Sequence, residues 1–274
     1  MVIALLALLP VALLMLLGWL QRRMIYYPRA YPEPLELPSG VLLLEYRTAQ
    51  GVQTAFYLPP TAPLAAGLPP KLWLLCGGNG ALALEWLELL ADFPDPSAAF
   101  LLLDYPGYGR CRGWASPTAI TKSIDRALLT LASRLHLSPQ RLTENLHALG
   151  HSLGSAAVLL VAVRHPLQRL VLISPFTSLK DMAALLVGKP LSRTLLHDYD
   201  NRAQLRQVLD QEMEVAITII HGSHDKVVPV TMGRELAALS PRINYQEIER
   251  GDHNYILLTH RAEIRRVMSG ERNP

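Results

Sequence analysis

The first apolar run of the chain extends from Val2 to Leu20 and contains no charged side chain. As a helix rising about 1.5 Å per residue, this run reaches roughly 28 Å, close to the hydrocarbon thickness of a bilayer. A proline-rich stretch follows it. The pattern predicts a transmembrane anchor over residues 1–23, a stiff connector over 24–40 and a folded domain over 41–274.

The residues that flank the apolar run indicate whether it is cleaved as a signal peptide and which way it crosses the membrane. A cleaved signal peptide is the alternative, but no Lys or Arg precedes the run and no Ala-x-Ala site follows it. Arg22, Arg23 and Arg29 lie on its C-terminal side, so the positive-inside rule favours the cytoplasm for the folded domain. We expect a single-pass membrane protein. Three arginines are too few to decide on which side of the membrane the domain lies, and cleavage of the run also stays open.

Beyond residue 40, apolar runs alternate with helical patterns. Residues 41–48 and 52–60 flank a turn and predict a hairpin. The predicted strands are 71–76, 98–106, 146–150, 167–175, 214–222 and 243–249, and the predicted helices are 81–93, 116–135, 152–165, 230–239 and 256–269. Near-continuous Leu, Ile and Val runs indicate strands buried on both faces, so the chain predicts an α/β fold with a mostly parallel sheet between helices. Residues 176–213, approximately, are too long for an ordinary connection and predict a short cap insertion.

Composition narrows the possible functions. The chain has 274 residues, of which 50% are apolar and 18% charged, which suits one large α/β domain or two small ones. The net charge of +3 is not gathered into a dense Lys/Arg cluster, so nucleic acid is not a predicted partner. Cys76 and Cys111 are too few and too far apart for a metal site or a disulfide framework. No metal or cofactor is implied.

Two glycines and a serine interrupt the apolar residues at Gly150-His151-Ser152-Leu153-Gly154. A predicted strand precedes this stretch and a predicted helix follows it, which is the context of a nucleophile elbow. The glycines allow close packing around a sharp turn, and the turn holds the hydroxyl of Ser152 at the carboxyl edge of the sheet. The pattern predicts that Ser152 is a nucleophile.

A serine hydroxyl needs a base that takes its proton and an acid that orients the base. Hydrolases with this elbow carry them in the order Ser, Asp or Glu, His, each after a strand. Asp225 and His253 each follow a predicted strand in that order. We therefore expect Ser152, Asp225 and His253 to meet as catalytic residues, with His224 as the rival base although it precedes the acid.

Two other histidines near this edge are interpreted as structural. His151 lies inside the elbow but is expected to point away from the serine. His221 ends a predicted strand, where packing is favoured over catalysis.

A tetrahedral intermediate needs hydrogen-bond donors for its oxyanion. The backbone N–H of Leu153, directly after the nucleophile, is the first candidate. The glycine-rich loop Gly77-Gly78-Asn79-Gly80 follows the strand 71–76, and the backbone N–H of Asn79 is the second candidate.

These residues resemble the α/β-hydrolase superfamily, and most closely its membrane-anchored domain-containing proteins with a serine-aminopeptidase-like domain. The resemblance is carried by "QRRMIYYP", "CGGNG", "LDYPGYGRCRG", "GHSLG", "ISPFTSL", "HGSHDKVVP" and "GDHN", which span most of the chain. It implies Ser152 as nucleophile, Asp225 as acid and His253 as base, with an oxyanion hole at Asn79 and Leu153. One departure is Gly77-Gly78-Asn79, where the family usually has His-Gly-Asn.

The sequence thus predicts a membrane-tethered serine hydrolase that forms an acyl-enzyme. Esters or thioesters are the expected chemistry, with a small-molecule or lipid-like acyl compound as substrate. The anchor favours a lipid-like or lipidated substrate, because its acyl chain would be concentrated at the bilayer. A serine peptidase and a non-catalytic scaffold that keeps the fold are the alternatives.

Overall fold

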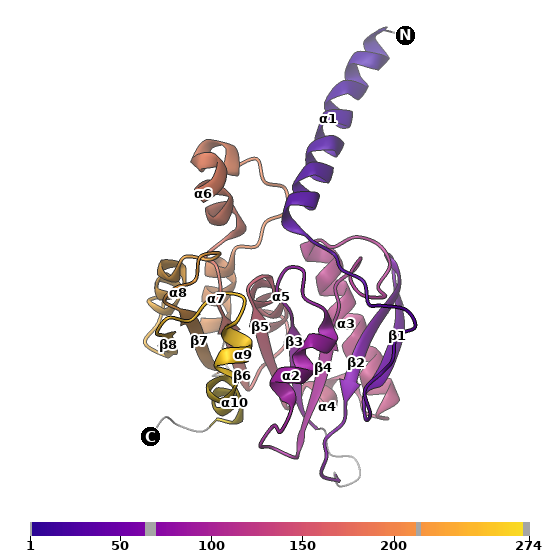
Figure 1. Cartoon of the computed structure of the whole chain (residues 1–274). Helices are drawn as coiled ribbons and strands as arrows, with labels where there is room; N and C mark the ends of the chain where they lie inside the picture. The colour runs from indigo at the N-terminus through magenta and orange to yellow at the C-terminus, as the bar shows by residue number, and fades with distance from the viewer. Residues whose placement is uncertain (1, 64–69, 212–214, 271–274) are drawn as a thin grey trace.

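A computed structural model of the chain describes residues 2–63, 70–211 and 215–270, with side chains from residue 14 onward. Eight strands form one sheet in the order β1-β2-β4-β3-β5-β6-β7-β8 (Figure 1). β1 pairs with β2, and β2 with β4, in antiparallel fashion, whereas all other neighbours are parallel. The predicted α/β fold, with its mostly parallel sheet, is confirmed.

The strands lie close to their predicted positions. They are β1 (Leu42–Thr48), β2 (Gly51–Leu58), β3 (Lys71–Cys76), β4 (Ala98–Leu103), β5 (Leu146–His151), β6 (Arg169–Ile173), β7 (Ala216–Gly222) and β8 (Ile243–Ile248). Since β3 and β5 to β8 run parallel, the loops after their carboxyl ends meet at one edge of the sheet.

Helices cover both faces of the sheet because its central strands are apolar on both faces. Leu72 and Leu74 of β3 pack into one buried cluster with α3 (Pro117–Arg134) and α5 (Leu153–Ala162). Trp73, between them, belongs to the second cluster, which contains α2 (Trp86–Leu90), α9 (Ile256–Thr259) and α10 (Arg261–Ser269). Alternate residues of one strand therefore fill two cores, one under each helical layer (Figure 1).

Several helices differ in extent from the prediction. The helix predicted over 81–93 is a 3₁₀ turn (η1, Ala83–Glu85) followed by the short α2. The final predicted helix divides at His260 into α9 and α10. The short α4 (Pro139–Thr143), which Ser138 caps, was not predicted, whereas α8 (Val230–Ala237) was.

The predicted cap insertion contains two helices, α6 (Leu179–Ser192) and α7 (Asn201–Leu209). Gly188 breaks α6 with a φ of 78°, and Pro190 follows two residues later, so the last turn changes direction. α7 packs beside α5, whereas α6 projects above the sheet edge (Figure 1). The predicted end of the insertion, residues 212 and 213, lies outside the described residues.

The N-terminal helix α1 (Val2–Ile25) extends two residues beyond the predicted anchor and projects on the same side as α6 (Figure 1). Within the part of the chain whose side chains are described, no helix is long and apolar enough to cross a bilayer. Residue 1 and the side chains of residues 2–13, which make up much of the predicted anchor, lie outside that part, and the anchor stays a prediction.

The end of α1 is attached to the cap insertion. Gln21 donates from Nε2 to the carbonyl of Thr194 (2.9 Å) and accepts from the N–H of Leu196 (2.8 Å). The buried Tyr26 places its hydroxyl 3.0 Å from that of Tyr199. The connector that follows lies along the domain, since the carbonyl of Arg29 accepts from the N–H of Gly109 (2.7 Å).

Asp104, directly after β4, is a buried carboxyl that makes stability depend on pH. Its Oδ1 accepts the N–H of Ala83 at 2.8 Å. Burial raises the pKa of Asp104 to about 6, which the N–H of Ala83 and the hydroxyl of Tyr31 only partly offset. The folded carboxyl thus keeps its proton at a higher pH than the unfolded one, so the contribution of Asp104 to stability falls as pH rises from about 4 to about 6 and is level above that window.

We expect Asp104→Asn to remove this pH dependence, because the amide keeps the acceptor for Ala83 but carries no charge. The wild type should lose about 3 kcal/mol of unfolding free energy across the window through this group. Urea unfolding at a series of pH values measures the slope. Asp210→Asn, at an exposed carboxyl after α7, is the matched control and should keep the wild-type slope. An unchanged slope in Asp104→Asn would contradict the assignment.

Candidate active site

Ser152 occupies a strained turn between β5 and α5. Its φ of 55° and ψ of −117° are unusual for a residue with a side chain, and its N–H donates to the carbonyl of Ile173 at 2.9 Å. A Cβ on Gly154 would overlap the carbonyl oxygen of Cys76, and a Cβ on Gly150 would overlap the carbonyl of Gly154. Both glycines are therefore required by close packing, and the turn has the geometry that the sequence predicts for a nucleophile elbow.

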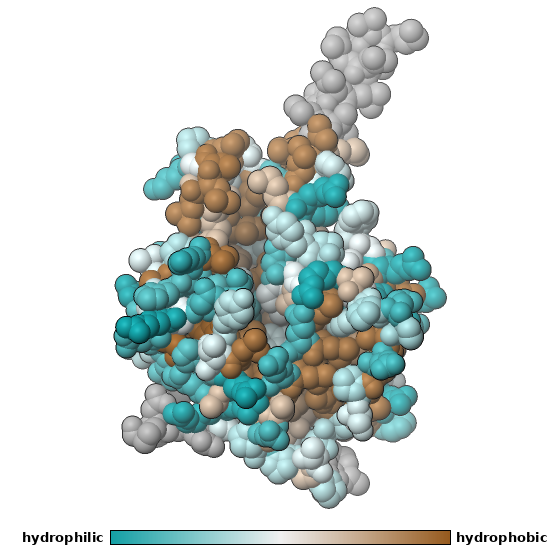
Figure 2. All heavy atoms as spheres, viewed as in Figure 1, coloured by the Kyte–Doolittle hydropathy of each residue, from teal (hydrophilic) through white to brown (hydrophobic). Residues whose placement is uncertain are grey.

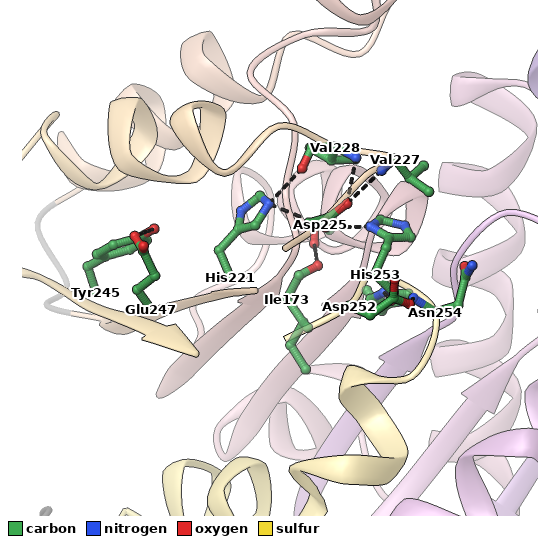
Figure 3. Close-up of polar contacts among 12 residues, drawn as sticks. Ile173, His221, Asp225, Val227, Val228, Tyr245, Glu247, Asp252, His253 and Asn254 are labelled. Atoms are coloured by element: carbon green, nitrogen blue, oxygen red, sulfur yellow. Dashed lines mark hydrogen bonds and ion pairs between the residues drawn. The ribbon is translucent and has the colours of Figure 1, made fainter. Parts of the chain in front are cut away.

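Asp225 and His253 are in direct contact (Figure 3). Nδ1 of His253 lies 2.6 Å from Oδ2 of Asp225, and both side chains are buried. Oδ1 of Asp225 accepts the N–H groups of Val227 (2.9 Å) and Val228 (2.7 Å), which fixes the plane of the carboxylate. Burial opposes ionisation of this carboxyl, but hydrogen bonds from His221, His253 and Val228 outweigh it and hold the pKa of Asp225 well below its usual value.

His221 contacts the same carboxylate from the other side (Figure 3). Its Nε2 lies 3.0 Å from the carbonyl of Val228 and 3.4 Å from Oδ2 of Asp225. Because a carbonyl only accepts, Nε2 carries a proton and faces the carboxylate with it. The sequence interpretation of His221 as a packed residue missed this contact. Its spacing of four residues from Asp225 was the available signal.

His151 packs against His253 and contacts its backbone. Its Nε2 lies 3.0 Å from the carbonyl of His253, and the two ring centroids are 4.9 Å apart. Burial, followed by the neighbouring His253, lowers the pKa of His151 to about 3, so its ring is neutral and donates to that carbonyl. His151 therefore fixes the backbone of His253.

The structure brings Asp225 and His253 together but does not join His253 to Ser152 by a hydrogen bond. Within the described residues, neither the hydroxyl of Ser152 nor Nε2 of His253 has a hydrogen-bond partner. Both residues follow parallel strands, β5 and β8, and therefore lie at the same sheet edge. Nε2 is the free nitrogen of the pair, because Nδ1 donates to Asp225.

Leu153 and Asn79 are the two residues that the sequence predicts to supply N–H donors for an oxyanion. Leu153 is the first residue of α5, and Asn79 lies in the loop after β3; both line the same cavity as Ser152. Neither N–H donates to another described group. The side chain of Asn79 has a different role: Nδ2 donates to the carbonyl of Ile25, and Oδ1 accepts the N–H of Tyr27 (2.9 Å). The sequence did not indicate this attachment of the loop to the end of α1.

A cavity of about 620 Å³ opens beside Ser152. Its walls come from three segments: the end of α1, α6 with Phe176 before it, and the loop after β7. The apolar lining residues are Met24, Ile25, Leu153, Phe176, Leu179, Met182, Ala183, Leu185, Leu186, Leu195, Val227, Val228 and Pro229, and the polar ones are Gln21, Asn79, Ser152 and Lys226. The cavity therefore suits a largely apolar ligand with one polar end near Ser152. The described residues contain no group of three or more His, Cys, Asp and Glu that could hold a metal ion.

A sheet with this order, an elbow after its central strand and a buried Asp–His pair after two later strands define an α/β hydrolase. The family model for the alpha/beta hydrolase fold matches residues 72–197. An uncharacterized protein of Mycobacterium tuberculosis is 31% identical over 242 residues, which are 86% of this chain and 81% of that protein. The chain belongs to the α/β-hydrolase superfamily.

Other similar proteins are more distant. The alpha/beta hydrolase domain-containing protein WAV2 of Arabidopsis thaliana is 24% identical over 85% of this chain and 81% of that protein. Among solved structures, the thioesterase domain of the curacin biosynthetic pathway has a TM-score of 0.60 at 12% identity, covering 84% of this chain and 99% of that one. An esterase from Rhodococcus sp. has a TM-score of 0.56 at 16% identity, covering 83% and 98%. These structures share the fold; the aminopeptidase-like subgroup and the membrane anchor stay predictions.

Proposed function

We propose that this protein is a serine hydrolase that cleaves an acyl ester or thioester through Ser152, His253 and Asp225. The observation that carries the proposal is the buried Asp225–His253 pair, joined at 2.6 Å, at the sheet edge where Ser152 sits in its strained turn. Solved structures with the same fold include an esterase and a thioesterase, which is in keeping with this chemistry.

The reaction begins with transfer of the Ser152 proton to Nε2 of His253 while Oγ bonds to the acyl carbon. Asp225 keeps the proton of His253 on Nδ1 and stabilises the imidazolium. Hydrogen bonds to a catalytic serine often form fully only in the substrate complex, and we propose that the bond from Ser152 Oγ to Nε2 of His253 forms when the substrate binds. The N–H groups of Leu153 and Asn79 donate to the oxyanion.

Collapse of the tetrahedral intermediate expels the alcohol or thiol, which takes the proton from Nε2, and leaves the acyl group on Ser152. Water then gives a proton to Nε2 as its oxygen attacks the acyl carbon. Release of the acid returns that proton to Ser152. Apart from the water molecule that is consumed, no group outside the chain is needed for this balance.

The apolar cavity supports a lipid-like acyl group as substrate. Membrane attachment through residues 1–23 remains part of the proposal, because a tether would bring the cavity close to lipid substrates. α1 and α6, which form two walls of the cavity, project on the same side of the domain (Figure 1).

The preference for long over short acyl chains tests whether the cavity beside Ser152 binds the acyl chain of the substrate. We expect Ala183→Trp, which fills the cavity from α6, to lower kcat/KM for long-chain p-nitrophenyl esters by about 30-fold, the equivalent of two to three buried methylenes. The acetate ester should be cleaved at nearly the wild-type rate. Ala184→Trp is the matched control, since Ala184 does not line the cavity. Equal loss for short and long esters would place the acyl chain elsewhere.

A further inference from the structure

A second cavity, of about 670 Å³, lies between the end of α1 and the loop of residues 106–115. This cavity and the cavity beside Ser152 lie on different faces of α1. Gln21 and Ile25 line the cavity beside Ser152, whereas Arg22 and Tyr26 line the second cavity. The proposed hydrolase chemistry uses none of its side chains.

The side chains that line this cavity carry a net positive charge, and acidic partners neutralise only part of it. Three arginines line it, and none of its described lining residues is acidic. Arg29 is paired with Glu85 at 2.7 Å, but neither Arg22 nor Arg23 has an ion pair within the described part of the chain. The Nε of Arg22 is buried and donates to no described group. Two guanidinium groups are thus available to an anion.

Aromatic rings hold these two guanidinium groups at the cavity. That of Arg22 lies 5.8 Å from the ring centroid of Trp114, and that of Arg23 lies 5.0 Å from the ring centroid of Trp19. Planar contacts of this kind leave the N–H groups at the guanidinium edges free to donate. Two guanidinium groups that line one cavity and keep free edges are suited to a phosphate.

The surroundings indicate a lipid rather than a soluble phosphate compound. The described part of α1 just before the arginines exposes apolar side chains, among them Leu14 (57%), Met15 (71%) and Leu20 (46%). α6 exposes Leu185 and Leu186 on the same side of the domain. Figure 2 shows both apolar patches above a more polar body. Apolar surface followed at once by Trp and Arg is the pattern of a membrane–water boundary.

We propose that this cavity binds the phosphate of an anionic phospholipid, with Arg22 and Arg23 as the donors. The lipid tails then lie along the exposed apolar face of α1. Bound lipid fixes the end of α1, and with it one wall of the catalytic cavity. The proposal rests on the membrane contact proposed above and not on the acyl chemistry.

Lipid retention measured by native mass spectrometry tests this proposal. The full chain is purified in dodecyl maltoside and mixed with equal amounts of phosphatidylglycerol and phosphatidylcholine. We expect the wild type to retain phosphatidylglycerol preferentially, and the double variant Arg22→Gln/Arg23→Gln to lose about 30-fold of that preference at roughly 1 kcal/mol per arginine. Preference that is absent in the wild type, or unchanged in the double variant, overturns the proposal.

The matched control is Arg47→Gln/Arg126→Gln, which removes the same charge from a different surface cavity and should keep the wild-type preference. An excess of glycerol 3-phosphate separates the two sources of phosphate. It should not displace the lipid, and displacement accompanied by its own binding would assign the cavity to a soluble ligand instead. Fluorophosphonate labelling of each variant reports folding of the catalytic domain. A wild type that retains lipid without labelling would contradict the hydrolase proposal alone.

Discussion

Ser152→Ala is expected to abolish covalent labelling by a fluorophosphonate probe and to lower kcat for a cleavable ester on the order of 10⁶-fold. The loss is this large because the acyl-enzyme cannot form without the hydroxyl. Folding should be retained, because the turn depends on the backbone N–H of Ser152 and on the packing of Gly150 and Gly154 rather than on the hydroxyl. Gel fluorescence and single-turnover kinetics measure the two effects.

Ser174→Ala is the matched control for that experiment. Ser174 is a buried serine directly after β6, at the same sheet edge, and its hydroxyl has no hydrogen-bond partner among the described residues. Labelling should survive its loss. A folded wild type that takes no label would favour the non-catalytic scaffold, and cleavage of aminoacyl amides in preference to esters would favour the peptidase.

Asp225→Asn is expected to lower kcat about 10⁴-fold while leaving Ser152 in place. The amide oxygen can still accept from Val227 and Val228, so the amide nitrogen then faces Nδ1 of His253. That nitrogen is a donor, which forces the imidazole proton onto Nε2 and removes the acceptor for the serine proton. Steady-state kinetics with a short ester, across a range of pH, measures the loss.

Asp252→Asn removes the same charge one residue from His253 and is the control for Asp225→Asn. Its carboxylate accepts only the N–H of Asn254 in the described contacts, a bond that the amide can keep. Activity close to wild type is expected. Retention of more than about a tenth of the activity in Asp225→Asn would remove Asp225 from the relay.

Local sequence made the candidate active site predictable. Ser152 is marked by two glycines that only a tight turn requires, and Asp225 and His253 each follow an apolar strand in the order expected of this fold. The strand positions came from apolar runs buried on both faces. A structural feature that is determined by residues adjacent in the sequence can be predicted without knowledge of the tertiary structure.

Contacts between distant segments were not predictable in this way. The bond between Gln21 and Thr194 joins residues 173 apart, and the side chain of Asn79 binds a carbonyl 54 residues earlier. His221 and Asp225 are only four residues apart, but their contact depends on the shape of the loop after β7, which the spacing alone does not specify.

The attachment of Asn79 to the end of α1 has a practical consequence for anyone who shortens this chain to obtain a soluble enzyme. Deleting everything before residue 41 would release the loop that carries Asn79, the proposed oxyanion donor, and would leave the cavity beside Ser152 open on one side. Low turnover in such a truncated preparation would then reflect damage to the candidate active site, and would say little about whether the proposed activity of the full chain needs a membrane.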